Sequence, residues 1–232
     1  MKIESHSDFL MTFAHDLRQP LRSIMMSAQR MQRGQEELSL EMRAKVEEIA
    51  AAARRQEELI ASVVEYDQAL ASASSADSPL PVRLAIQTAC MKVDAFRQAQ
   101  QGLIQFDAQQ VPRVLVSPEL ARVLEKCLHN GLKFHTSDSS PRVTVQVSET
   151  SGDLVVVRVS DWGLGIETEY REAVFEPFKR LNANSDFPGS GLGLATCRRL
   201  VHAMKGTIRF EDNGSGQGVS LVVILPRLEA GV

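Results

Sequence analysis

The sequence is poor in several residue types, and each scarcity excludes a class of protein. Aromatic residues make up 5% of the 232 residues, and the three cysteines are Cys90, Cys127 and Cys197. An odd number of cysteines without paired spacing predicts reduced thiols rather than a disulfide framework. No apolar run approaches the roughly 18 residues that a transmembrane helix needs, and the N-terminus lacks a signal-peptide core. We therefore expect a cytoplasmic protein with no membrane span in this chain.

An excess of charge of one sign is also missing. Lys and Arg total 26, Asp and Glu total 29, and the net charge is −3. Non-specific binding of nucleic acid requires a basic excess, so we expect no nucleic-acid partner. The 44% of hydrophobic residues can form a buried core, which excludes a disordered chain.

Glycine is nearly absent from the first part of the chain, where only Gly34 precedes Gly102. The small, polar segment 71–81 then ends in two prolines, a composition typical of a linker. We predict a helical domain over 1–72, a linker over 73–81 and a glycine-dependent mixed domain over 82–232, which together make an α+β protein.

In the first part of the chain, apolar residues recur at alternating intervals of three and four positions, as in a coiled-coil seam. The first seam comprises Leu10, Ala14, Leu17, Leu21, Ile24, Ala28 and Met31, and the second comprises Met42, Val46, Ile49, Ala53, Ile60, Val63 and Leu70. Gln56 and Asp67 interrupt the second seam. A helical hairpin buries too little surface alone, so the seams predict a homodimeric four-helix bundle. The alternative is that both helices pack on the second domain.

The second part alternates short β-branched runs with helical patterns. We expect helices and strands in the order helix 84–100, helix 118–134, strand 142–150, strand 154–159, helix 192–204, strand 207–210 and strand 219–225. The strands should form antiparallel hairpins. This pattern predicts an α/β sandwich with helices on one face of a mixed sheet.

Polar and glycine-rich clusters mark the chemistry of the second part. They are His129–Phe134 at a helix end, Asp161–Ile166 after a strand, and Gly189–Ala195 at a helix start. Glycines at a helix N-terminus let backbone N–H groups approach a phosphate. A carboxylate before Gly-x-Gly can accept a hydrogen bond from a base, and an amide oxygen suits Mg²⁺ shared with phosphates. The spacing matches neither a dinucleotide fingerprint nor a Walker loop.

In this order, with Phe175-Glu176-Pro177-Phe178 between the last two, the clusters resemble the ATP-binding domain of sensor histidine kinases. That domain shares its fold with gyrase, Hsp90 and MutL. The segment Phe13–Leu21, which contains His15, resembles the phospho-acceptor box of the same family. Within the family, the residues of these motifs are most similar to those of phytochrome-type transmitter modules. The resemblance runs from about Phe9 to about Pro226.

The resemblance implies an autophosphorylating ATP:protein-histidine phosphotransferase that uses ATP and Mg²⁺. Its partners would be a second copy of the chain and a response-regulator receiver domain, whose aspartate takes the phosphoryl group. Asn130 would ligate Mg²⁺, Asp161 would read adenine and Phe134 would line the base. The other implied nucleotide-binding residues are Lys133, Gly163, Gly165, Arg180, Gly189, Gly191, Leu192 and Gly193.

His15 would be the phospho-acceptor. It lies one position past Ala14 of the seam and should therefore face solvent, and Pro20 should bend the helix beside it. Asp16 would orient the imidazole or take its proton. Gln19, where the family usually has Thr or Asn, is a phosphatase candidate.

Segment 166–189, here called the flap segment, is expected to move. We expect Phe175 and Phe178 to dock it on the domain and Arg180 to neutralise the transferring phosphate.

The chain departs from the family pattern at other positions of the site. Lys126 stands where a first asparagine is usual, and Gly131 stands where Ala is usual. Lys126 and Gln19 keep a non-catalytic dimeric scaffold open as an alternative. An ATPase or serine kinase of the same superfamily is a further alternative. Only a short segment precedes His15, so the signal would come from a separate sensor protein or from a domain outside this sequence.

Overall fold

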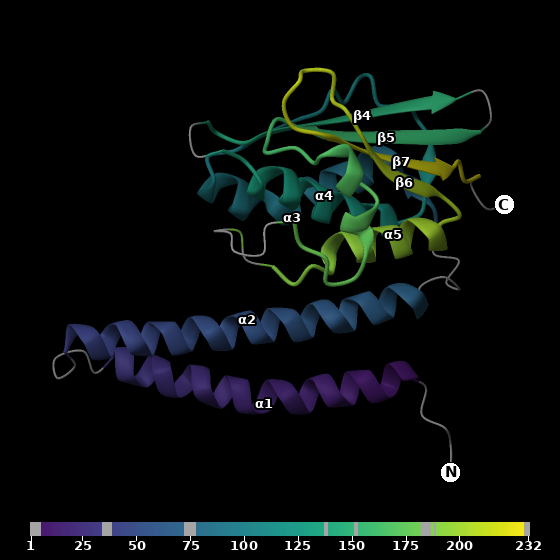
Figure 1. Cartoon of the computed structure of the whole chain (residues 1–232). Coiled ribbons are helices and arrows are strands. Elements are labelled where there is room, and N and C mark those ends of the chain that lie inside the picture. The colour runs from purple at the N-terminus through teal and green to yellow at the C-terminus, as the bar shows by residue number, and fades with distance from the viewer. Residues whose placement is uncertain are drawn as a thin grey trace, which may run out of the picture. The chain divides into compact units, whose positions relative to one another are not determined.

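The structure is a computed structural model, and it divides the chain into two compact units, Met1–Ala71 and Ser72–Val232 (Figure 1). It describes residues 6–33, 39–71, 78–136, 139–150, 153–181, 187 and 189–229. Most of the predicted linker lies outside these residues. Leu80 and Pro81 are described and form strand β1, which pairs with β3 (Leu115–Val116) of the second unit.

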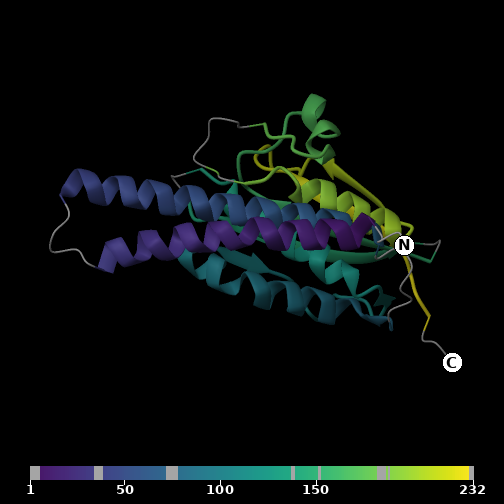
Figure 2. The same cartoon turned by 90° about the horizontal axis from the view of Figure 1, so that it is seen from below.

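The N-terminal unit is a hairpin of two long helices, α1 (His6–Arg33) and α2 (Leu40–Ala71). They lie side by side in both views (Figures 1 and 2). Ser39 caps α2, because its Oγ accepts a hydrogen bond from Met42 N at 3.2 Å. Pro20 lies inside α1 without ending it. The predicted helical hairpin is therefore confirmed.

Small side chains bring the two helices of the hairpin close together. Ala28 of α1 and Val46 and Ala50 of α2 form a buried cluster at their contact. The predicted seams do meet each other here. Other seam residues stay exposed within one chain, among them Ile24 and Ile49.

The C-terminal unit contains a five-stranded sheet of order β2-β4-β5-β7-β6. The strands are β2 (Leu103–Gln105), β4 (Arg142–Thr150), β5 (Leu154–Asp161), β6 (Thr207–Glu211) and β7 (Ser220–Pro226). The sheet is mixed, because β2 runs parallel to β4 while the other neighbours are antiparallel. Both predicted hairpins and the α+β class are confirmed.

Helices α3 (Val82–Ala99), α4 (Glu119–Lys133) and α5 (Gly193–Ala203) cover one face of this sheet (Figure 1). The inward residues of β4 alternate with polar ones, whereas β7 is apolar throughout Leu221–Leu225. Val145 pairs with Val159 across β4 and β5. Together with Leu124 and Leu128 of α4, these valines are buried in the core. The helices begin and end within two residues of their predicted limits.

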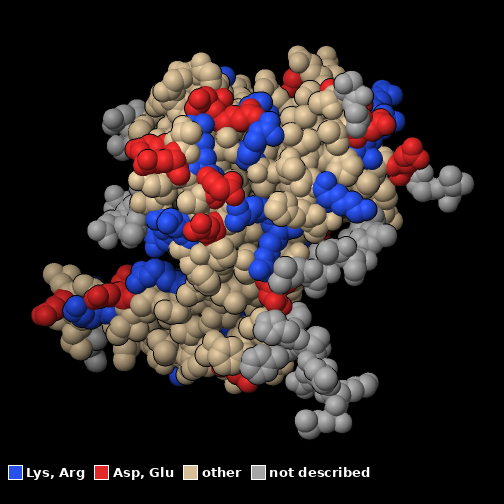
Figure 3. Space-filling model, turned by 45° about the vertical axis from the view of Figure 1, so that its right-hand side comes forward, with Lys and Arg blue, Asp and Glu red and all other residues tan. Residues whose placement is uncertain are grey.

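Two further features concern the surface and the thiols. Acidic and basic side chains are interspersed over the face drawn in Figure 3, in keeping with the small net charge. Cys90, Cys127 and Cys197 are free thiols. A hydrogen bond with Cys197 and burial raise the pKa of Cys127 well above its usual value. Among the described residues, no helix is long and apolar enough to cross a membrane.

The first half of the flap segment is built into the domain. It contains two short 3₁₀ helices, η2 (Thr168–Tyr170) and η3 (Ala173–Phe175). The Phe175 ring is 1% exposed and lies 5.3 Å from the Phe210 ring, so its predicted docking role is confirmed. Phe178 is different, because its side chain is 60% exposed. The expectation that the Phe178 side chain docks the flap was wrong: among the described residues, Phe178 is held through its backbone, with Phe178 N donating to Gly191 O at 3.0 Å.

Candidate functional site

The predicted nucleotide-site residues converge at one end of the C-terminal sheet, where β5 ends at Asp161. The carboxylate Oδ1 of Asp161 accepts a hydrogen bond from Gly163 N at 2.9 Å. Burial raises the pKa of Asp161 to about 6, although backbone hydrogen bonds from Gly163 and Val219 oppose the rise. Asp161 is therefore a half-buried, partly desolvated hydrogen-bond acceptor.

The turn after Asp161 packs on the C-terminal end of α4. Leu164 N donates to Phe134 O at 3.0 Å. A Cβ on Gly163 would lie 2.0 Å from the same oxygen, so only glycine fits there. Gly131 is confined less severely, because its Cβ would lie 2.8 Å from Val143 Cγ2 and 3.4 Å from Asp161 Cβ. Gly131 thus lets α4 approach the sheet beside Asp161, which gives a packing reason for glycine at this position.

The last turn of α4 presents Asn130, Lys133 and Phe134 near this turn. Asn130 is half-buried, and its carbonyl accepts a hydrogen bond from Phe134 N at 3.0 Å. Lys133 Nζ lies 5.2 Å from the centroid of the Phe134 ring. A Cβ on Gly189 would lie 3.2 Å from the same Nζ, so Lys133 joins the helix end to the second glycine cluster.

The second glycine cluster leads into α5. Gly191 adopts a positive φ of 72° and packs against the backbone of Phe178, where a Cβ would lie 2.7 Å from the carbonyl carbon. Leu192 is 1% exposed, so its side chain belongs to the core and only its backbone faces the loop. Around Gly193, no described atom lies within 4 Å of an added Cβ. The helix start is thus anchored by Leu192 and open at Gly193.

Arg180 is exposed and reaches the site through Phe187. Its Nη2 donates to Phe187 O at 3.3 Å, and the Phe187 ring lies 5.3 Å from the Phe134 ring. Arg180 and Phe134 are therefore linked by one residue of the flap segment. Sequence reasoning did not single out Phe187, because an isolated aromatic residue in a polar loop carries no periodic signal.

Lys126 lies one turn before Asn130 on α4. Burial lowers the pKa of the neighbouring His129, and the charges of Lys133 and Lys126 lower it further. The His129 ring stacks on Phe96 of α3 at 4.2 Å. His129 is thus a packing residue, and the lysines on either side of it give this part of α4 a positive potential.

The predicted acceptor lies in the other unit, on α1. His15 is 65% exposed and Asp16 is 70% exposed, and His15 Nδ1 lies 3.4 Å from Asp16 Oδ1. Gln19 is also exposed, one helical turn further on. The expectation that His15 faces solvent is confirmed. Asn213 was missed altogether: its side chain donates to Asp161 O, whereas the sequence indicated only a hairpin turn there.

Two family models match the chain. The His Kinase A (phospho-acceptor) domain matches residues 5–71, and the histidine kinase-, DNA gyrase B-, and HSP90-like ATPase domain matches residues 116–229. The chain belongs to the sensor histidine kinases of two-component systems.

Known relatives agree with this assignment. The chain is 29% identical over 231 residues to the adaptive-response sensory kinase SasA of Rippkaea orientalis, which covers 94% of this chain and 57% of that protein. It is 32% identical over 108 residues to the phytochrome-like protein Cph1 of Synechocystis, covering 47% of this chain and 14% of that one. The chain thus spans little more than half of the first relative and a small part of the second.

A solved structure has the same fold. Full-length ShkA in complex with AMPPNP matches 97% of this chain and 47% of its own, with a TM-score of 0.74 and 23% identity.

Proposed function

We propose that this chain is an ATP-dependent, autophosphorylating protein-histidine kinase that passes its phosphoryl group to an aspartate of a response-regulator receiver domain. The observation that carries the proposal is the convergence of a half-buried carboxylate, Asp161, with the end of α4 and the glycine cluster before α5. An exposed His15–Asp16 pair on a separate helical unit supplies the acceptor. Family membership supports both halves.

In the C-terminal unit, one set of residues would bind the adenine of ATP and another set would bind its phosphates. The Asp161 carboxylate accepts a hydrogen bond from the adenine amino group, and the Phe134 ring lies against the base. Lys133, Arg180 and the backbone N–H groups near Gly191 and Gly193 then neutralise the phosphates. Positioning and charge neutralisation supply most of the rate in phosphoryl transfer, and these residues provide both.

The donor set of the site fits Mg²⁺. In the described ranges, no group of three His, Cys, Asp or Glu side chains could hold a metal by itself. Mg²⁺ typically takes few protein ligands and keeps water and substrate phosphates for the rest, so the single amide oxygen of Asn130 suffices. When bound, Mg²⁺ would offset the negative charge of the phosphates.

His15 would act as the nucleophile. With Nδ1–H donating to Asp16, the imidazole keeps its free electron pair on Nε2. Nε2 forms the bond to the γ-phosphorus while the bond to the ADP oxygen breaks, and Asp16 takes the Nδ1 proton. In transfer to a receiver domain, an aspartate oxygen forms the bond to phosphorus while the phosphorus–nitrogen bond breaks. The proton on Asp16 returns to Nδ1, which restores His15.

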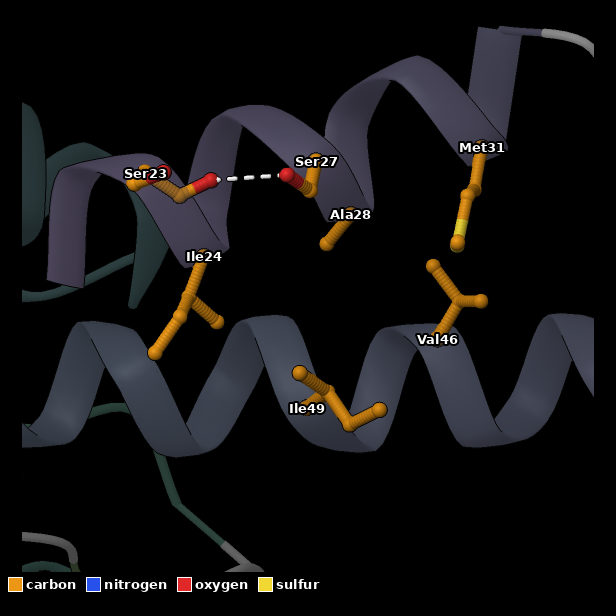
Figure 4. A pocket seen from close by; sticks show the side chains of 7 residues that line it. All are labelled: Ser23, Ile24, Ser27, Ala28, Met31, Val46 and Ile49. Carbon is orange, nitrogen blue, oxygen red and sulfur yellow. Dashed lines mark hydrogen bonds between the residues drawn. The ribbon is translucent and has the colours of Figure 1, made fainter. Parts of the chain in front are cut away.

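Homodimerisation of the helical hairpin is part of this proposal. Apolar seam residues remain 40–56% exposed in one chain: Leu17, Ile24, Met31, Met42 and Ile49. Some of them line a groove of about 260 Å³, in which Ile24 and Met31 of α1 face Val46 and Ile49 of α2 (Figure 4). A second hairpin would cover this stripe and complete a four-helix bundle.

Sedimentation equilibrium tests the dimer. Ile49→Glu places a charge on the stripe and should shift the chain toward monomer. Leu40→Glu is the matched control, because Leu40 is 84% exposed and lies off the seam. A wild-type chain that sediments as a monomer at micromolar concentration would refute this part of the proposal.

Labelling with [γ-³²P]ATP tests the kinase activity. We expect an acid-labile, base-stable label on the wild type and none on His15→Gln, while ADP affinity stays at the wild-type value. His202→Gln is the control, because His202 is another exposed helical histidine. Label on a serine would favour a serine kinase, phosphate release without labelled protein would favour an ATPase, and nucleotide binding without either would favour a scaffold.

A further inference from the structure

The loop between β6 and β7 is fastened by one half-buried side chain, Asn213. Asn213 Nδ2 donates to Asp161 O at 2.7 Å and to Gln217 O. Asn213 Oδ1 accepts hydrogen bonds from Ser215 N at 2.9 Å and from Ser215 Oγ at 2.7 Å. Both protons and both acceptor positions of the amide are therefore used.

The chemistry of these partners fixes the orientation of the Asn213 amide. The carbonyls of Asp161 and Gln217 can only accept, so the NH₂ group must face them. The backbone N–H of Ser215 can only donate, so the amide oxygen must face it. An aspartate has the same shape but no proton to donate to Asp161 O at neutral pH, and an alanine has neither function.

Asp161 is consequently held on its backbone by this loop and on its side chain by the turn that follows. Its N–H donates to Val219 O at 2.9 Å, its C=O accepts from Asn213, and its carboxylate accepts from Gly163 N at 2.9 Å. Gly218 touches the same carbonyl so closely that an added Cβ would lie 2.1 Å from Asp161 O.

A second tether binds the same loop to the segment after Asp161. Arg171 pairs with Asp212, and its Nε donates to Ile166 O at 3.1 Å. The loop is thus connected to both ends of the turn that carries the Asp161 carboxylate. Of the two side-chain tethers, the Asn213 bond is the one that reaches Asp161 itself.

We propose that Asn213 is a positioning residue of the nucleotide site, which fixes the Asp161 backbone so that the carboxylate meets the adenine amino group. The inference rests on the proposed function, in which Asp161 reads the base. A carboxylate held at one angle discriminates strongly, because guanine presents a carbonyl oxygen where adenine presents its amino group. A carboxylate that can turn discriminates less.

Calorimetric titration of the full chain with ADP and with GDP, at one fixed Mg²⁺ concentration, tests the proposal. The wild type should prefer ADP. Asn213→Ala and Asn213→Asp should lose about tenfold in ADP affinity with little change for GDP, because one directed hydrogen bond is removed. Ser215→Ala is the matched control: it leaves the Asn213–Asp161 bond in place and should keep the wild-type preference.

The outcomes separate this inference from the proposed function. If both Asn213 variants keep the wild-type ratio of ADP to GDP affinity while Asp161→Asn abolishes it, the inference is wrong and the function stands. Equal loss of both nucleotides also overturns it, because Asn213 would then serve the fold alone. If the wild type binds no ADP or shows no base preference, Asp161 is misassigned and the inference falls with it. Should Asn213→Ala fail to fold, the isosteric Asn213→Asp variant decides.

Discussion

Gly163 lies against the carbonyl of Phe134 so closely that a Cβ on Gly163 would come within 2.0 Å of that oxygen. The contact joins the turn after β5 to the end of α4. The contact therefore fixes the positions of Asp161 and Phe134 relative to each other, although they belong to different elements. A change at this contact should disturb folding and binding together.

Two glycine substitutions should separate packing from binding. Gly163→Ala forces the turn away from Phe134 and should destabilise the C-terminal unit by about 1–3 kcal/mol, with loss of ADP binding. Gly193→Ala meets no described atom within 4 Å and should leave stability unchanged or raise it by about 0.5–1 kcal/mol, since alanine favours a helix. It should still weaken ADP binding, because the Cβ enters the space assigned to phosphate. Thermal unfolding and calorimetry measure both, and unchanged ADP affinity in Gly193→Ala would contradict this assignment.

Asp161→Asn should abolish base recognition and at the same time stabilise the ligand-free domain at neutral pH. Burial raises the pKa of Asp161 from the ordinary value of 3.8 to about 6, so between these pH values the folded state binds more protons than the unfolded state. Stability contributed by this group is present below pH 3.8 and is lost as pH rises through 6. The asparagine variant avoids that loss, and it should be about 1–3 kcal/mol more stable than the wild type at pH 8. Urea unfolding at pH 4 should show a much smaller difference.

Lys126→Asn should make nucleotide binding more dependent on Mg²⁺. Lys126 precedes Asn130 by one turn of α4, and its positive charge would assist the metal in neutralising the phosphates. We expect ATP affinity in EDTA to fall about tenfold in the variant, with a smaller change in excess Mg²⁺. Lys92→Asn is the control, because Lys92 pairs with Glu125 on the surface. Equal losses in EDTA and in Mg²⁺ would show that Lys126 does not substitute for the metal.

Asp16→Asn should slow the labelling of His15 without changing ADP affinity. Loss of the proton acceptor beside the imidazole should cost a factor of about 10²–10⁴ in rate. Glu48→Gln removes an exposed carboxylate of α2 and serves as the control. Initial rates of label incorporation measure the effect, and a wild-type rate in Asp16→Asn would assign the proton to solvent.

Local periodicity predicted most of the fold. It failed for the elements whose formation depends on contacts with residues far along the chain. The helical hairpin and the strand pairs followed from spacing and turn residues, which act within a few positions. Strand β2 is only Leu103–Gln105, and it exists because it pairs with β4, far along the chain. Phe175 and Phe178 look alike in the sequence, yet only Phe175 finds a neighbour in Phe210.

The candidate site divides in the same way. Short sequence motifs were enough to identify part of the site, namely Asn130, Lys133, Asp161 and the glycines, because each motif indicates its own chemistry. Asn213 could not, because Asn-Gly is equally typical of an ordinary hairpin turn. Its role depends on a bond to a carbonyl in a distant strand.

The open apolar stripe of the helical hairpin has a consequence for how the chain responds to dilution. The C-terminal unit closes its own core over the sheet, so its unfolding should not depend on how many copies are present. In the proposed dimer the hairpin instead shares its core with a second copy, and mass action would then link its melting midpoint to protein concentration. Thermal melting should therefore show a transition that moves to lower temperature on dilution beside one that stays fixed. The abundance of the protein would then set the stability of the helix that carries His15, whereas the stability of the C-terminal unit would not change with abundance.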